Sequence, residues 1–222
     1  MAYRLDGKDI DITGKRLTKI GTGVTGDVYK YKNVALKIFK KDKKPPIDYG
    51  TAKFLTGIQT ERILLPRNLL FYNDAFCGYT YKLVSKKGSG NRLIMLPREE
   101  LVENVRAIEK DTRTISSKKV LLNGIEPSNC IFNGTLYVSD PKDYSILETF
   151  STRELEALNR YQIHMLLSSL ITSEIRKTSL GNSFERQIKE LFEGKDIETN
   201  TSDFLKDIMR PGETIKQLSK KY

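Results

Sequence analysis

The hydrophobic period changes along this chain, and the change limits the fold more than any other sequence feature. Residues 17–39 read LTKIGTGVTGDVYKYKNVALKIF, in which short pieces rich in Val, Ile and Tyr are punctuated by glycine, as in β-strands. From residue 98 onwards, apolar residues recur every three or four positions, which is the spacing of amphipathic helices. Strands followed by helices predict an α+β fold with an N-terminal antiparallel sheet and a mainly helical C-terminal part.

Turn signals divide the N-terminal part into strands. Lys32-Asn33 is expected to be a tight turn, and the strands LLFYN and GYTYKLV are expected on either side of a turn at DAFC. The segment KKDKKPP interrupts the strand pattern because proline fits neither a helix interior nor a central strand.

Helix signals occur in several places. A short helix is expected over residues 49–59 and a long amphipathic helix from about Arg98 to Val120. Ser151 and Glu154 form a capping box, in which each side chain accepts a backbone N–H of the other residue, so a helix is expected to begin there. Two or three more helices are expected over residues 173–222.

A change of composition predicts two units. The segment SKKGSGN, residues 85–91, bears glycine and serine and is typical of a connector. We therefore expect an N-terminal lobe over residues 1–86 and a helical C-terminal lobe over residues 87–222. In the second lobe CIFNG and TLYVSD indicate a short hairpin.

Composition argues against several classes of function. The chain has 222 residues, of which 38% are hydrophobic and 30% charged, as in globular proteins. No apolar run approaches the roughly 20 residues of a membrane span, so a cytoplasmic protein without membrane contact is expected. The only histidine, His164, leaves no basis for a multi-histidine metal site and is interpreted as structural. Cys77 and Cys130 are expected to be reduced.

The net charge of +10 could attract nucleic acid. The sequence contains neither zinc-finger spacing nor an RNA-binding strand motif, so a solvated lysine-rich surface is the favoured interpretation.

The glycine loop is the strongest local motif. Gly21-Thr22-Gly23-Val24-Thr25-Gly26-Asp27-Val28 satisfies the pattern G-x-G-x-x-G-x-V without substitution. A dinucleotide-binding fold would place a helix after such a loop, whereas VYKYKNVALKIF is strand-like. A hairpin is therefore expected, in which Gly21, Gly23 and Gly26 let backbone amides approach the phosphates of a nucleotide.

A lysine motif follows one strand later, at Val34-Ala35-Leu36-Lys37. An ammonium group on a strand beneath a glycine loop can neutralise nucleotide phosphates. Alone, Lys37 could be an outward-facing strand residue, but the complete glycine loop before it favours the functional interpretation.

With these motifs the chain resembles the eukaryotic-like protein kinase family, as a minimal bacterial member. The resemblance covers about residues 15–170. The family's catalytic loop, H-R-D-x-x-x-x-N, aligns with LNGIEPSN, so that Asn129 matches its asparagine. Asp140, at the end of LYVSD, matches the metal-binding aspartate of D-F-G, although Pro141-Lys142 follow it here.

The resemblance implies a two-lobed fold that binds ATP and Mg²⁺. Asn129 and Asp140 would supply the oxygen ligands that Mg²⁺ prefers. Lys37 would contact the phosphates. Val28 and Ala35 would cover the adenine from one side, and Ile131 would support it from the other.

The catalytic loop departs from the family pattern at its most important position. Gly124 stands where the family has its catalytic aspartate, and glycine cannot accept a proton. Acid–base groups typically contribute about 10²- to 10⁴-fold, so its loss predicts slow or absent transfer with ATP binding almost intact. Glu126 is a candidate substitute base, although it could instead repel the γ-phosphate or be a solvated surface residue.

Other departures are softer. Thr51 aligns with the helix glutamate that pairs with the lysine in the family, and Asp48 is a weak candidate for that pairing. Asn159 aligns with a buried aspartate. The segment from Asp140 to Ser151 is short and lacks A-P-E, so the usual platform for a peptide is not expected.

Four functions stay open. The favoured one is an MgATP-binding kinase-like protein, inactive or slow, that acts as a nucleotide-dependent regulatory module on a protein partner or a partner kinase. The alternative is an active Ser/Thr protein kinase that uses Glu126 or substrate-assisted chemistry. Transfer of AMP is a third, and nucleic-acid binding is ranked last.

Overall fold

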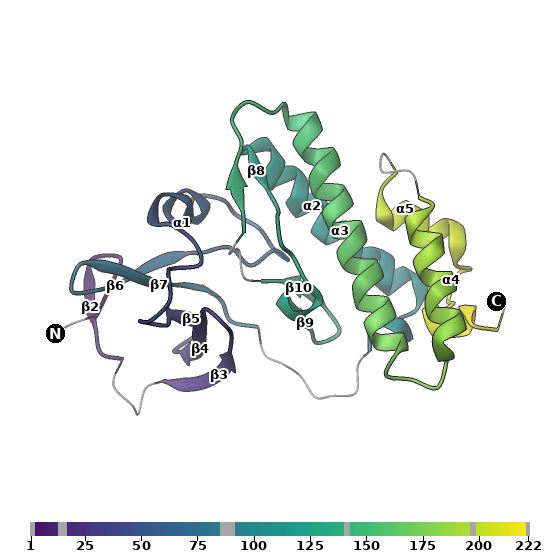
Figure 1. Cartoon of the computed structure of the whole chain (residues 1–222), viewed down its shortest axis with the longest axis horizontal. Helices are drawn as coiled ribbons and strands as arrows, with labels where there is room; N and C mark the ends of the chain where they lie inside the picture. The colour runs from purple at the N-terminus through teal and green to yellow at the C-terminus, as the bar shows by residue number, and fades with distance from the viewer. Residues whose placement is uncertain (1–2, 13–16, 85–91, 140–142, 196–198, 221–222) are drawn as a thin grey trace.

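The computed structural model describes residues 3–12, 17–84, 92–139, 143–195 and 199–220. Within these ranges the chain forms a seven-stranded antiparallel sheet and several helices, which confirms the predicted α+β class. In Figure 1 the sheet lies at one end of the molecule and the last helices lie at the other. The predicted connector at residues 85–91, and with it the boundary between the two expected lobes, lies outside the described residues.

Every neighbouring pair of strands in the sheet is antiparallel, in the order β2-β1-β6-β7-β5-β4-β3. The strands are β1 (Tyr3–Leu5), β2 (Lys8–Ile10), β3 (Thr18–Thr22), β4 (Gly26–Tyr31), β5 (Val34–Phe39), β6 (Asn68–Tyr72) and β7 (Ala75–Lys82).

Two tight turns differ from the sequence expectation. The β6–β7 turn is formed by Asn73-Asp74, and not by DAFC, because Asn and Asp tolerate the positive φ angles of 48° and 66° that this turn requires. The β1–β2 hairpin was not predicted, although its turn, Asp6-Gly7, is a strong hairpin signal and has φ angles of 48° and 76°. The predicted turn at Lys32-Asn33 is confirmed between β4 and β5.

The two faces of the sheet are covered differently. Along β5 the side chains alternate, so that Ala35 and Phe39 pack in the main core while Leu36 lies in a smaller cluster on the opposite face. Lys37 follows the same alternation and therefore shares the core-facing side with Ala35.

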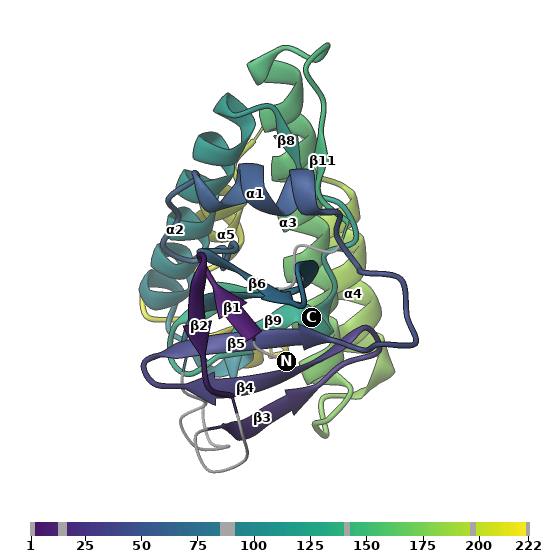
Figure 2. The ribbon, with the colours of Figure 1, turned by 90° about the vertical axis from the view of Figure 1, so that its left-hand side faces the viewer.

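Six α-helices lie in the described part of the chain. The last three, over residues 181–218, agree with the expectation of two or three helices beyond residue 173. They are α1 (Tyr49–Thr56), α2 (Arg98–Ser117), α3 (Thr152–Ile175), α4 (Gly181–Glu193), α5 (Thr201–Ile208) and α6 (Ile215–Leu218). In Figure 2, α1 lies above the strands of the sheet. No described helix is both long and apolar enough to cross a membrane.

Helix ends follow from capping. The predicted capping box at the start of α3 is confirmed, since the Ser151 hydroxyl accepts the Glu154 N–H at 3.2 Å and the Glu154 carboxylate accepts the Ser151 N–H at 2.8 Å. The α1 helix ends before Gly57, and α2 ends before Lys119, whose φ of 62° is incompatible with a continuing helix. Both helices are therefore slightly shorter than predicted.

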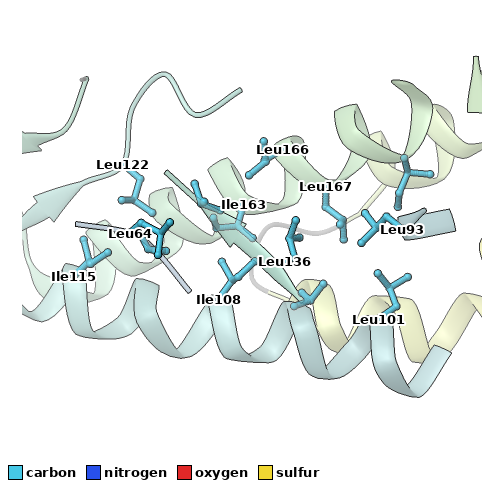
Figure 3. Close-up of a cluster of buried hydrophobic side chains, with 14 of the residues drawn as sticks. Leu64, Leu93, Leu101, Ile108, Ile115, Leu122, Leu136, Ile163, Leu166 and Leu167 are labelled. Carbon is cyan, nitrogen blue, oxygen red and sulfur yellow. The ribbon is translucent and has the colours of Figure 1, made fainter. Parts of the chain in front are cut away.

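The main core runs without interruption from the sheet to the C-terminal helices. Its centre is a leucine- and isoleucine-rich layer in which the buried faces of α2 and α3 meet, as Figure 3 shows. Side chains from the segments between helices fill the same layer, which contains Leu64, Leu93, Leu101, Ile108, Ile115, Leu122, Leu136, Ile163, Leu166 and Leu167.

A buried carboxylate joins the segment after α1 to the helices. Asp111 of α2 accepts backbone N–H groups of Glu61 at 3.0 Å, Arg62 at 2.6 Å and Ile63 at 2.9 Å. The next N–H, that of Leu64, donates to the Val138 carbonyl at 2.7 Å. These bonds fix the segment between α1 and β6 relative to α2 and to the segment that contains Val138.

Candidate functional site

A cavity of about 560 Å³ lies between the glycine hairpin and residues 128–139. Most of the predicted site residues converge on it, although they come from distant parts of the sequence. Its lining consists of Ile20, Gly21, Thr22, Gly23, Gly26, Val28, Lys30, Ala35, Lys37, Tyr81, Leu83, Val84, Ser128, Asn129, Cys130, Ile131 and Ser139.

The sheet wall of the cavity, formed by β3, β4 and β5, carries the glycine loop and the lysine. The loop is the expected hairpin, with Gly21 in β3 and Gly26 at the start of β4. Val28 of β4 is paired with Lys37 of β5, so these two side chains are neighbours across the strands. Ala35 lies two residues before Lys37 and therefore on the same face.

The three glycines have different steric roles. A Cβ atom at Gly26 would lie 2.6 Å from the Ile38 carbonyl oxygen, whereas one at Gly21 would meet only the Val28 side chain at 3.7 Å. Gly23 donates its N–H to the Gly26 carbonyl at 2.8 Å, which closes the hairpin tip. The strand pairing thus requires glycine at position 26 whether or not a ligand is bound.

Lys37 is buried, with 3% of its surface exposed, and its Nζ lies 5.9 Å from the centre of the Tyr79 ring. An ammonium group that borders a cavity and is shielded from bulk water interacts strongly with an anion bound there. Lys37 is therefore well placed to contact the phosphates of a ligand.

Asp48, the weak candidate partner for Lys37, has another role. Its carboxylate accepts the Thr51 N–H at 2.9 Å and the Thr51 hydroxyl at 2.6 Å, so it is the N-cap of α1. The hydrogen bonds from the Thr51 side chain and backbone hold the pKa of Asp48 below its ordinary value. The residue that the alignment placed at the glutamate position, Thr51, is thus the capping partner of Asp48.

The opposite wall, called the loop wall below, is built on the short 3-10 helix η3 (Pro127–Asn129) and the strands β9 (Cys130–Phe132) and β10 (Leu136–Val138). The two strands pair antiparallel, as the predicted hairpin requires. Ile131, on β9, belongs to the cavity lining. The loop wall thus presents an apolar side chain and the polar end of η3 to the same space.

Asn129 is the buried polar group of this wall. Its side-chain oxygen accepts the Glu126 N–H at 2.9 Å, and its backbone carbonyl accepts both the N–H and the hydroxyl of Ser139, at 2.8 Å and 2.7 Å. An amide oxygen has two lone pairs, so one stays available for a cation. The bonds to Ser139 fix the chain immediately before Asp140.

Asp140, the second predicted metal ligand, lies outside the described residues. In the part of the chain that the structure does describe, no cluster of three or more His, Cys, Asp or Glu side chains could hold a metal ion. Binding of Mg²⁺ by Asn129 and Asp140 therefore stays a prediction from the sequence.

Glu126, the candidate base, is exposed and does not belong to the cavity lining. Its carboxylate accepts the Ser128 hydroxyl at 3.3 Å, and its backbone is bonded to Asn129 at both N–H and carbonyl. The side chain is thus turned back onto η3.

The carboxylate of Asp143 lies beside Gly124, the residue that aligns with the catalytic aspartate of the kinase motif. Gly124 has a φ of +60°, and a Cβ atom built on it would lie 2.3 Å from Oδ2 of Asp143 and 2.9 Å from its Cγ. Sequence reasoning missed Asp143. The only local sign of this contact is the pairing of two-residue strands, β8 (Val120–Leu121) with β11 (Ser145–Ile146), which have no readable period.

Asn159 fixes the chain that leads to Gly124. Its side-chain oxygen accepts the Leu122 N–H at 2.7 Å, and its amide nitrogen donates to the Ser116 hydroxyl at 2.8 Å and the Val120 carbonyl at 2.9 Å. A side-chain amide satisfies all three partners, because its nitrogen donates in two of the contacts and its oxygen accepts in the third.

The apolar part of the lining also contains residues that sequence reasoning missed. Tyr81 lies near the end of β7, and Leu83 and Val84 follow that strand into the cavity.

Burial raises the pKa of the Cys130 thiol to about 12, so it stays protonated at neutral pH and is a poor nucleophile. Both cysteines are free, as expected.

Comparison with known proteins adds no family to this geometry. No protein-family model matches the chain, and a search of curated proteins finds no significant match. The functional argument therefore depends on the residues of the site.

Proposed function

We propose that this chain is a kinase-like protein that binds MgATP in the cavity between the sheet wall and the loop wall. The observation that carries the proposal is convergence: the glycine loop, Lys37 and Asn129, which belong to separate motifs, line the same space. The cavity volume of about 560 Å³ lies within the range of small-molecule sites, roughly 300–1,000 Å³.

The lining supports a division of labour. Val28, Ala35 and Ile131 offer apolar surface to the adenine, while the hairpin amides and Lys37 suit the phosphates. Asn129 offers an amide oxygen for Mg²⁺, and Asp140 stays its predicted co-ligand from the sequence. Bound Mg²⁺ would neutralise phosphate charge, and these residues would orient the nucleotide.

The proposed arrangement is two-lobed, with the sheet and α1 on one side of the nucleotide and the helical part on the other. A ligand held by both walls favours the closed arrangement over an open one. In this way the protein would act as a nucleotide-dependent module toward a protein partner, such as an active kinase.

Active transfer to serine or threonine is the alternative. Glu126 is poorly placed to act as the base for it, because its carboxylate accepts the Ser128 hydroxyl and is turned back onto η3. The Asp143 carboxylate, which lies beside Gly124, favours this alternative.

Calorimetric titration of the full chain with ATP and excess Mg²⁺ tests the binding proposal. We expect Lys37→Met to weaken binding by about 10- to 100-fold, since a hydrogen bond to a charged group is typically worth about 1.5–3 kcal/mol. Lys43→Met removes an exposed lysine outside the cavity lining and should leave affinity unchanged. Absence of binding, or equal affinity in both variants, would contradict the proposal.

A further inference from the structure

We propose that Asp143 supplies the carboxylate that position 124 lacks, so that the chain transfers the γ-phosphoryl group of MgATP to a hydroxyl group. This inference rests on the proposed MgATP site and makes the site catalytic.

An oxygen of Asp143 lies close to the Cβ site of residue 124. In any aspartate, the carboxylate oxygens lie about 2.4 Å from the residue's own Cβ, as ordinary bond lengths require. Oδ2 of Asp143 lies 2.3 Å from the Cβ site of residue 124. A carboxylate oxygen from another residue thus stands as near to that site as the oxygen of an aspartate at position 124 would.

A side chain at position 124 and the Asp143 carboxylate exclude each other. A side chain at position 124 would fill the volume that the Asp143 carboxylate occupies, and a φ of +60° already favours glycine there. The two residues therefore depend on each other. The absence of a side chain at Gly124 leaves room for the Asp143 carboxylate, and this carboxylate takes the place of the one that an aspartate at position 124 would provide.

Backbone pairing next to Asp143 sets its position. Ser145 is paired with Leu121 and Ile146 with Val120, so the chain that begins at Asp143 enters a strand pair with the segment just before Gly124. The Leu147 N–H donates to the Lys119 carbonyl at 2.8 Å and extends the pairing at the other end. Because Asn159 holds residues 120–122 from α3, both chains are fixed where the contact forms.

The placement suits a group that acts on the acceptor. Asp143 is exposed and is not part of the cavity lining, yet it lies beside the loop that carries Asn129 into that lining. It can therefore receive an incoming hydroxyl group without contacting the adenine side of the nucleotide.

In the proposed step, the bond formed at the γ-phosphorus replaces its bond to ADP. The acceptor oxygen forms a bond to the γ-phosphorus while its proton passes to the Asp143 carboxylate. The bond between the γ-phosphorus and the β–γ bridging oxygen breaks, and ADP leaves with that electron pair as the Mg²⁺ complex. The proton is then released from Asp143 to solvent.

The test measures phosphoryl transfer by the full chain from labelled MgATP to itself, to a mixture of Ser/Thr peptides and to water. We expect Asp143→Asn to lower the rate by about 100-fold or more, the usual contribution of an acid–base group. Its affinity for MgATP should stay within about twofold, because Asp143 does not line the cavity. Glu148→Gln, which changes an exposed acid of the same segment, should leave the rate unchanged.

A swap experiment separates catalysis from a structural role. Asp143→Ala vacates the space, and adding Gly124→Asp returns a carboxylate from the other residue. We expect this double variant to regain at least about tenfold of the lost rate. The matched pair Asp143→Ala with Gly124→Asn has the same shape without the charge and should regain none.

Two outcomes would overturn the inference and spare the binding proposal. One is a wild-type chain that binds MgATP but transfers phosphoryl no faster than Asp143→Asn. The other is an Asp143→Asn rate within about threefold of wild type, with Glu126→Gln accounting for the loss instead. A wild-type chain that binds no MgATP overturns both proposals.

Discussion

The two walls of the cavity are built on different principles. The sheet wall consists of consecutive hairpins, so Val28, Ala35 and Lys37 reach the cavity through strand alternation and nearest-neighbour pairing. The loop wall consists of segments that meet from distant parts of the chain, and side-chain bonds from Asn129, Asp111 and Asn159 hold them in place. The first wall can be deduced from local pattern, whereas the second depends on polar contacts between elements.

This difference predicts where each wall is vulnerable. Backbone crowding between paired strands limits the sheet wall, while the loop wall depends on a few buried polar groups. Loss of a buried hydrogen-bond acceptor leaves several donors without partners, which costs more than a local steric adjustment.

The largest effect is expected at Asp111, where the two parts of the chain are joined. Asp111→Ala leaves the N–H groups of Glu61, Arg62 and Ile63 without their acceptor, at about 1–3 kcal/mol for the buried Ile63 N–H and less for each of the two part-buried ones. We expect a loss of about 3 kcal/mol or more in the free energy of unfolding, measured by urea denaturation. Glu103→Ala, at an exposed position of α2, should change it by less than about 0.5 kcal/mol.

The next effect concerns Asn159 of α3, which holds the chain that leads to the loop wall. Asn159→Asp removes the donor that binds the Val120 carbonyl and places a carboxylate oxygen against it, inside the core. We expect about 2–4 kcal/mol of destabilisation by urea denaturation, from an unsatisfied acceptor and a buried charge. Asn182→Asp, the same change at an exposed site in the first turn of α4, should be neutral or slightly stabilising. Equal effects at the two sites would show that the Asn159 contacts carry little free energy.

A smaller effect is expected in the sheet wall, where alanine substitutions of two glycines of the same motif should differ in their cost to stability. Gly26→Ala places Cβ 2.6 Å from the Ile38 carbonyl and forces β4 and β5 apart, at about 1–3 kcal/mol. Gly21→Ala meets the Val28 side chain at 3.7 Å, an ordinary contact, and should cost at most about 1 kcal/mol. Thermal unfolding of both variants without nucleotide measures the difference. Similar losses would mean that the motif acts as a flexible unit instead.

The smallest effect lies far from both walls, at the only histidine. The His164 ring is buried, its Nε2 lies 2.8 Å from the Phe192 carbonyl and its Nδ1 lies 3.2 Å from the Thr201 hydroxyl, which confirms a structural role. Burial lowers the pKa of His164 below its ordinary 6.5. The hydrogen bond to the Phe192 carbonyl opposes this shift, and the positive charge of Lys195 adds to it.

The lowered pKa of His164 makes the folded state less stable at low pH. As pH falls through the ordinary pKa, the unfolded chain binds a proton that the folded chain excludes, so stability is lost. The urea midpoint should therefore decrease from about pH 7.5 to about pH 5.5, and His164→Gln should flatten this decrease. Affinity for MgATP at low urea should not follow the same curve. An unchanged slope in His164→Gln would assign the pH dependence to carboxylates.

The sequence alone determined the fold class and most of the sheet wall. Period-two alternation, glycine spacing and the Ser151–Glu154 capping box are local patterns, because each depends on residues a few positions apart. The same reasoning placed Ile131 on a hairpin that begins directly after Asn129, because strand and turn residues alternate there over a few positions. It failed at the Asn73-Asp74 turn, where two positive φ angles outweighed the apparent loop at DAFC.

Only the tertiary structure decided the chemistry of the loop wall. The sequence presented Gly124 as a loss and offered Glu126, its near neighbour, as a replacement. The fold brings Asp143 to Gly124 through β8 and β11, strands too short to leave a pattern, and turns Glu126 back onto η3. A contact between distant residues is set by the packing of the elements that carry them, and such packing has no local signature for the sequence to display.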